Sequence, residues 1–100
     1  RSLRKLELNS TQIEDVDIVA FAEVAHSVPL CTTIDLSRNN IGNDGMQAFS
    51  DVIRSGDMAN LKFVAVYGNP GDISPVKLAC DVRGIQCPKD LMEHLIIVNS

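Results

Sequence analysis

One apolar pattern recurs three times along the chain, and this repetition constrains the fold more than any other feature. Each copy has three apolar positions, then a polar residue, then an apolar residue or glycine. The copies are offset by 28 residues (Leu3 to Cys31) and by 30 residues (Cys31 to Leu61). Regular repeats of this length indicate stacked units that bury one shared core. The positions are Leu3, Leu6, Leu8, Thr11 and Ile13; Cys31, Ile34, Leu36, Asn39 and Ile41; and Leu61, Val64, Val66, Asn69 and Gly71.

Each copy contains a strand followed by a helix. In the second copy, alternation over 33–37 places Ile34 and Leu36 on one face, which predicts a short half-buried strand. A Gly-Asn-Asp-Gly turn at 42–45 follows, and apolar residues at helical spacing then predict an amphipathic helix that ends near 55–56. The core-facing residues of this helix are Met46, Phe49, Val52 and Ile53.

The first and third copies repeat this order. Acidic residues precede the first helix, and the third helix is predicted to begin at Ser74 and Pro75 and to close at Gly84. The residues predicted to face inward are Ile18, Phe21, Ala22 and Ala25 in the first helix, and Val76, Ala79 and Val82 in the third. Strand-helix units in this sequence imply right-handed crossovers and a parallel sheet, with strands on the inner curve and helices outside.

We therefore expect an α/β solenoid that forms one unit over 1–100, with repeats at about 3–29, 30–60 and 61–91 and a partial fourth over 92–100. Neither end has a clear polar cap, so the chain is expected to be a fragment of a longer array. The fourth copy is open to two interpretations. Met92, Leu95 and Ile97 match the third strand pattern at a constant offset, which favours a strand, whereas helix-forming residues after Pro88 favour a helix.

Asn39 and Asn69 follow their strands at the same position of the repeat. The chain turns here while neighbouring repeats cover its backbone, and a backbone group left buried and unpaired costs roughly 1–3 kcal/mol. An amide side chain both donates and accepts, so it can satisfy such groups. Thr11 has a hydroxyl instead, and a looser first turn is expected there.

These residues together resemble leucine-rich repeats: 3–13, 31–45 with Phe49, and 61–69. The unit length and the Asn-x-Ile-x-x-x-Gly segment ending at Gly45 are similar to the ribonuclease-inhibitor-like subclass, which includes Ran GTPase-activating proteins and tropomodulin C-terminal domains. The first copy has Asp17 in place of that glycine, and the third has Pro75. The resemblance implies a scaffold that serves many different partners.

Composition excludes several classes of function. A net charge of −4 with scattered basic residues opposes binding to nucleic acid or to an acidic membrane surface. The apolar runs are far shorter than the ~20 residues of a spanning helix, and no signal peptide opens the chain. Three cysteines indicate free buried thiols in a reducing, cytoplasmic compartment, with a disulfide between Cys80 and Cys87 as the alternative.

The residues between the inward strand positions form the predicted concave surface. They fall into three columns: Lys5, Thr33, Phe63 and His94; Glu7, Asp35, Ala65 and Ile96; and Asn9, Ser37, Tyr67 and Val98. The first two repeats are polar here and the later ones are apolar, which predicts a protein-binding patch. The alternative is that a part of a longer chain, outside these 100 residues, covers Phe63 and Tyr67. The predicted partner-binding residues are Glu7, Asp35, Phe63, Ala65, Tyr67, His94 and Ile96.

No catalytic, cofactor or metal site is predicted. Cys80, Cys87 and His94 lack the short spacings of zinc ligands, and His26 with Cys31 is better explained as a helix-end cation and a core thiol. The sequence favours a noncatalytic, intracellular protein-protein interaction scaffold. The alternatives are a GTPase-activating protein of the Ran type, with Arg38 as the candidate arginine, and a self-associating structural or cytoskeletal protein that uses its uncapped ends.

Overall fold

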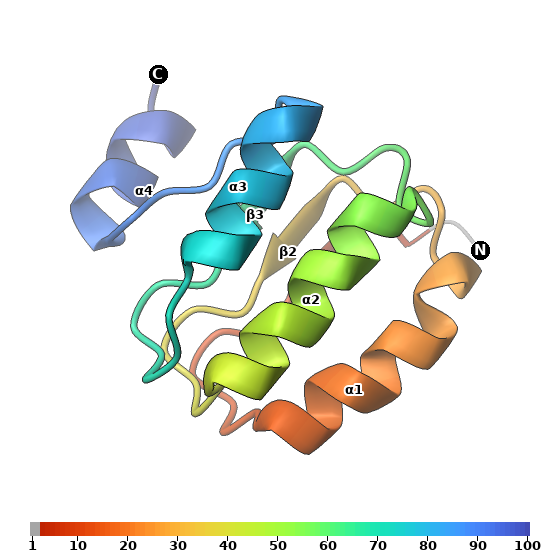
Figure 1. Cartoon of the computed structure of the whole chain (residues 1–100). Coiled ribbons are helices and arrows are strands. Elements are labelled where there is room, and N and C mark those ends of the chain that lie inside the picture. The colour runs from red at the N-terminus through yellow and green to blue at the C-terminus, as the bar shows by residue number, and fades with distance from the viewer. Residues whose placement is uncertain (1–2) are drawn as a thin grey trace.

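The computed structural model describes residues 3–100 as three strand-helix units followed by a further helix (Figure 1). The parallel sheet has the order β1-β2-β3. This confirms the expected α/β class and the strand and helix of each of the three copies. The elements are β1 (Lys5–Glu7), α1 (Asp15–Val24) with a 3-10 turn at Ala25–Ser27, β2 (Thr33–Asp35), α2 (Asn43–Ser55), β3 (Phe63–Ala65), α3 (Ser74–Arg83) and α4 (Leu91–Val98).

The helices α1, α2 and α3 lie side by side over one face of the sheet, whereas α4 stands apart from this row at the C-terminal side (Figure 1). The register pairs Leu6 with Ile34 and Ile34 with Val64, so one row of inward side chains runs across all three strands. The intervening residues face away from α1, α2 and α3. We call this side of the sheet the strand face.

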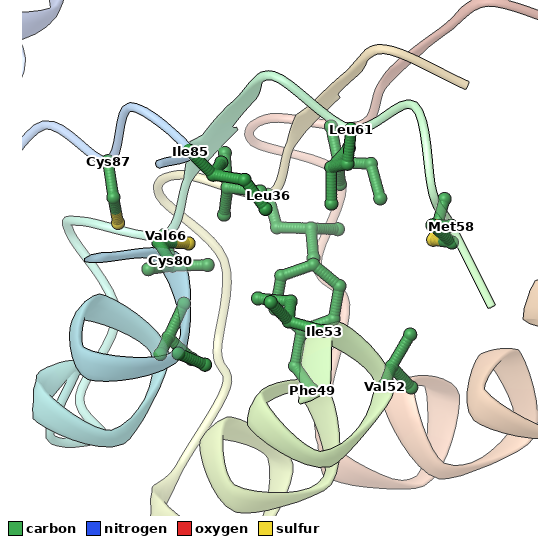
Figure 2. Packing of buried hydrophobic residues seen from close by; sticks show 14 of the residues in the cluster. Leu36, Phe49, Val52, Ile53, Met58, Leu61, Val66, Cys80, Ile85 and Cys87 are labelled. Carbon is green, nitrogen blue, oxygen red and sulfur yellow. The ribbon is translucent and has the colours of Figure 1, made fainter. Parts of the chain in front are cut away.

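The core fills the space between the sheet and the three helices. Figure 2 shows Phe49 and Ile53 of α2 pointing toward the strand side chains, with Leu36 close to the Phe49 ring. Ile34 and Val64 are completely buried. Burial of each such side chain contributes about 1.5–3 kcal/mol, so this layer is a main source of stability.

Close helix packing explains Gly45. A Cβ at this position would lie 2.5 Å from Asp15 Oδ1 and 2.6 Å from a methyl group of Ile41. The same Asp15 oxygen accepts a hydrogen bond from the backbone N–H of Gly42 at 2.6 Å. The glycine therefore allows the start of α1 to approach the start of α2.

Asn39 links the first two repeats through its side-chain amide. Its Oδ1 atom accepts from the backbone N–H groups of Thr11 and Ile13 at 2.9 and 3.0 Å, and its Nδ2 atom donates to the carbonyls of Leu8 and Leu36 at 3.0 Å each. One amide thus satisfies four backbone groups on both sides of the repeat junction, as the sequence predicted.

Asn69 repeats this arrangement one unit later. Its Oδ1 accepts from the N–H groups of Asn39 and Ile41, and its Nδ2 donates to Leu36 and Val66. Thr11 has no amide, and its hydroxyl donates to the backbone carbonyl of Leu8 in its own repeat at 2.6 Å. Next to it Gln12 has φ 63°, a left-handed conformation that the chain does not adopt at Asn40 or Pro70, so the first turn differs from the others.

The fourth strand favoured over 92–98 is wrong, because this segment is the helix α4. A single residue, Gln86, takes the strand position beside β3 instead. It forms a parallel bridge with Phe63, and its carbonyl accepts from Val64 N–H at 2.9 Å while its N–H donates to Lys62 at 3.0 Å. Pro88 follows and has no N–H to continue the pairing.

The inward position predicted for Val82 is also wrong. Val82 is 87% exposed, and Cys80 is buried in its place because Val76, Ala79 and Cys80 share one face of α3 at spacings of three and four residues. Arg83 continues this face. Its guanidinium donates to the carbonyls of Ile53 and Met58 at 2.7 Å each and so satisfies the end of α2.

We expect Asn39→Ala to lower the free energy of unfolding by at least about 1–3 kcal/mol, because four backbone groups lose their partner. Asn40→Ala is the matched control. The Asn40 side chain is exposed and its backbone N–H bond to Ile13 is retained, so a change below about 0.5 kcal/mol is expected. Urea denaturation measures both, and equal effects would contradict the structural role of the Asn39 amide.

Candidate interaction surface on the strand face

The strand face carries two rows of side chains in register. Lys5 pairs with Thr33 and Thr33 with Phe63, while Glu7 pairs with Asp35 and Asp35 with Ala65. Glu7 is exposed, and Asp35 and Phe63 are half-buried. Ala65, by contrast, is completely buried. The two rows lie where the sequence predicted them, but Ala65 is fully covered and Phe63 partly so.

Helix α4 covers this end of the strand face. Nδ1 of His94 lies 2.7 Å from the hydroxyl of Tyr67, and the imidazole ring packs on Phe63 and Tyr67 with centroid distances of 4.9 and 5.7 Å. Tyr67 is only 6% exposed as a result. His94 thus belongs with these aromatic residues, as the sequence grouped them, but it reaches them from a helix.

The cover of the aromatic patch comes from within the described chain. The sequence analysis attributed the cover of Phe63 and Tyr67 to a partner or to chain outside these residues, whereas the segment that packs on them is the one interpreted as a fourth strand. Ile96 does not join a strand column. It lies on α4 and is 62% exposed.

The start of α4 carries the signal that could have identified it. Asp90 accepts a hydrogen bond from the backbone N–H of Glu93 at 2.9 Å, and the Glu93 carboxylate accepts from the N–H of Lys89. An acidic residue followed three positions later by Glu, before an apolar run, is typical of a helix N-terminus. This local pattern outweighs the constant offset of the apolar positions.

A groove of about 290 Å³ lies between α4 and the open part of the strand face. The groove is lined from β1 and β2 by Lys5, Glu7, Thr33 and Asp35, from the β3 side by Phe63 and Gln86, and from α4 by His94, Ile97 and Val98. The side formed by β1 and β2 therefore carries two carboxylates beside one amine, and the opposite side is mainly apolar.

The Asp35 carboxylate has a fixed orientation. Its Oδ1 atom accepts from the backbone N–H of Ser37 at 3.0 Å and from the Ser37 hydroxyl at 2.7 Å. Ser37 itself is completely buried. The buried serine holds a half-exposed carboxylate at the floor of the groove, which reduces the side-chain freedom that binding would otherwise remove.

The three cysteines are free and buried, so the alternative disulfide between Cys80 and Cys87 is not formed. A hydrogen bond to Cys87, together with burial, raises the pKa of the Cys80 thiol, and the same hydrogen bond lowers the pKa of Cys87. Burial raises the pKa of Cys31 as well. These thiols are part of the core.

Arg38 is an exposed turn residue after β2. Its φ is 56°, and its backbone N–H donates to the Tyr67 carbonyl at 2.9 Å. Within residues 3–100, no three His, Cys, Asp or Glu side chains are grouped so that they could hold a metal ion. None of the helices over the same residues is both long and apolar enough to cross a membrane.

Parallel strand-helix units joined through asparagine amides define a repeat protein. The family model described as Leucine Rich repeat matches residues 1–22 and 32–50, which hold the strands of the first two copies and most of their helices. These matches support a leucine-rich repeat protein, a class that typically serves as a noncatalytic module for binding other proteins. Searches of curated proteins and of solved structures found no match.

The hydroxyl of Tyr67 is expected to hold α4 on the strand face. Tyr67→Phe removes one hydrogen bond, worth about 0.5–1.5 kcal/mol, and keeps the ring. Amide hydrogen exchange of α4 should therefore become roughly threefold to tenfold faster. The amides of α2 serve as the internal reference and should not change. Unchanged exchange in α4 would show that ring packing alone holds the helix.

Proposed function

We propose that the chain is a noncatalytic scaffold that binds a partner protein through the strand face. The observation that carries this proposal is the groove between α4 and β1–β3, where carboxylates and apolar side chains remain accessible beside a rigid sheet. Leucine-rich repeats generally mediate protein-protein interactions, and binding residues on a rigid scaffold lose little conformational freedom.

The proposed binding residues are those of the groove. Glu7, Asp35 and Phe63 remain from the sequence prediction, and His94 contributes from α4. Ala65 and Tyr67 would contact a partner only if α4 moved away, and Ile96 only from the opposite side of that helix. A cytoplasmic location fits the free thiols. The proposal includes membership of the ribonuclease-inhibitor-like subclass and a solenoid shape. Both are inferred from the length of the sequence repeat.

A bulky substitution at the centre of the strand face tests this function. Thr33 lies on the central strand and points into the groove, so Thr33→Arg should obstruct a partner without removing a core side chain. Gln47→Arg on the exposed side of α2 is the matched control. A photo-crosslinker at residue 33 identifies candidate partners, and calorimetry with each purified partner measures affinity.

We expect Thr33→Arg to weaken binding at least tenfold and Gln47→Arg to leave it unchanged. Loss of affinity only in the Gln47 variant would place the interaction on the helical side and contradict the proposal. The Ran-type alternative remains a prediction that rests on Arg38.

Self-association is a second candidate, favoured by the composition of α4. The helix has no buried residue, and it exposes Met92 and Ile96 by 66% and 62% together with Leu91, Leu95 and Val98. Exposed apolar patches of this kind mark interaction sites. The route differs from the sequence prediction, because a helix surface and not a strand edge would mediate the contact.

Light scattering over a range of concentrations tests self-association. If α4 mediates it, the apparent mass should rise with concentration, and Ile96→Ser should shift the midpoint to at least tenfold higher concentration. Val82→Ser, which removes an even more exposed apolar residue from α3, should have no effect. A constant monomer mass would contradict this candidate.

A further inference from the structure

We propose that the groove binds a protein segment that places an arginine over Glu7 and Asp35 and an adjacent aliphatic side chain against Phe63 and α4. This inference rests on the proposed function and specifies the chemistry of the partner. It follows from the register of β1 and β2, from the two unlike walls of the groove and from its size.

The acidic wall lacks a cation in its own row. Glu7 and Asp35 are direct neighbours across two paired strands, and the third residue of the row is Ala65. Like charges at facing positions of adjacent strands destabilise a sheet. Lys5 lies one row away, beside Thr33, and lines the same groove, so the carboxylates occupy one row and the amine its neighbour. A cation supplied from outside and placed over the Glu7-Asp35 pair would remove this repulsion.

The geometry of the pair favours arginine. Only Oδ1 of Asp35 is engaged by hydrogen bonds in the described part of the chain, both from Ser37, so Oδ2 keeps its acceptor capacity. A guanidinium has several donors in one plane and can reach two neighbouring carboxylates, whereas an ammonium acts as a point charge. The net charge of −4 of the whole chain further favours a basic partner.

The opposite wall selects an aliphatic neighbour for that arginine. Phe63 remains half-buried under His94, and Ile97 and Val98 of α4 face the same groove. The volume of about 290 Å³ lies at the lower limit of the roughly 300–1,000 Å³ of small-molecule pockets. It suits one or two side chains of a bound segment, and an acidic or wholly polar segment would leave the apolar wall unpaired.

Selection from a displayed library of random 12-residue peptides tests the proposal on the folded chain. The peptides retained should share an arginine next to a Leu, Ile, Val or Met. Their affinity, measured by fluorescence anisotropy, should fall roughly 10- to 100-fold for Glu7→Gln combined with Asp35→Asn, because a charge-assisted contact is lost. Asn can still accept from Ser37, so the local fold is kept.

Two further variants make the result specific. Glu23→Gln removes an exposed carboxylate from α1 and should leave the affinity unchanged. Replacement of the peptide arginine by glutamate should abolish binding to the native chain. The substitution Glu7→Lys at the exposed position should restore binding of this glutamate peptide in part. Without such restoration, the carboxylates would not contact the arginine and the proposal would be wrong.

Other outcomes separate this inference from the proposed function. The selected peptides could lack arginine and bind the Glu7 and Asp35 variants with unchanged affinity, yet lose affinity with Thr33→Arg. In that case the strand face binds a different chemistry, and only the further inference fails. If binding ignores Thr33→Arg as well, both fail. A selection that enriches no peptide also overturns the inference.

Discussion

The side-chain amides of Asn39 and Asn69 are the interactions on which the rest of the structure depends. Each amide satisfies backbone groups of its own repeat and of the preceding one, so it fixes the distance between two coils and the turn that leads into each helix. Satisfied turns let the buried aliphatic row stabilise the fold in full, because an unpaired buried N–H or C=O would cancel much of what the burial of one side chain contributes. The strand face is the opposite side of the same sheet, away from α1, α2 and α3.

The sequence predicted those parts of the fold that repeat. Three aligned copies of one pattern identify the strands, the inward residues such as Ile34 and Val64, and the role of the asparagines, because each copy supports the others. The sequence was less informative after the third copy, where the repeated pattern stops. Ile97 and its neighbours form a short apolar run whose spacing suits a strand and a helix alike, and periodicity alone cannot decide such cases. Val82 was misplaced because each step of three residues along a helix falls about 60° short of a full turn, so the series from Val76 through Ala79 leaves the buried face at Val82.

The candidate surface, too, could be predicted from the sequence only in part. Glu7 and Asp35 could be placed on one row from alternation alone, and the register confirms that they are neighbours. The burial of Tyr67 could not be inferred, since His94, far away in the sequence, packs on its ring and lies within hydrogen-bond distance of its hydroxyl. That contact changes the character of the surface. An open aromatic patch becomes a groove with an acidic wall and an apolar wall, which is a more selective arrangement than either wall alone.

The single-residue bridge at Gln86 determines how copies of this molecule could stack. The Lys62 carbonyl and the Val64 N–H are already bonded to Gln86, and Pro88 has no N–H to continue the pairing, so a strand from another copy finds fewer free backbone groups beside β3. Head-to-tail addition, which would extend without limit, therefore has fewer backbone groups available at this edge. Pairing through two β1 margins would relate the copies by a two-fold axis and would close after two molecules. The bridge thus makes open-ended growth through β3 less favourable at the cost of one residue.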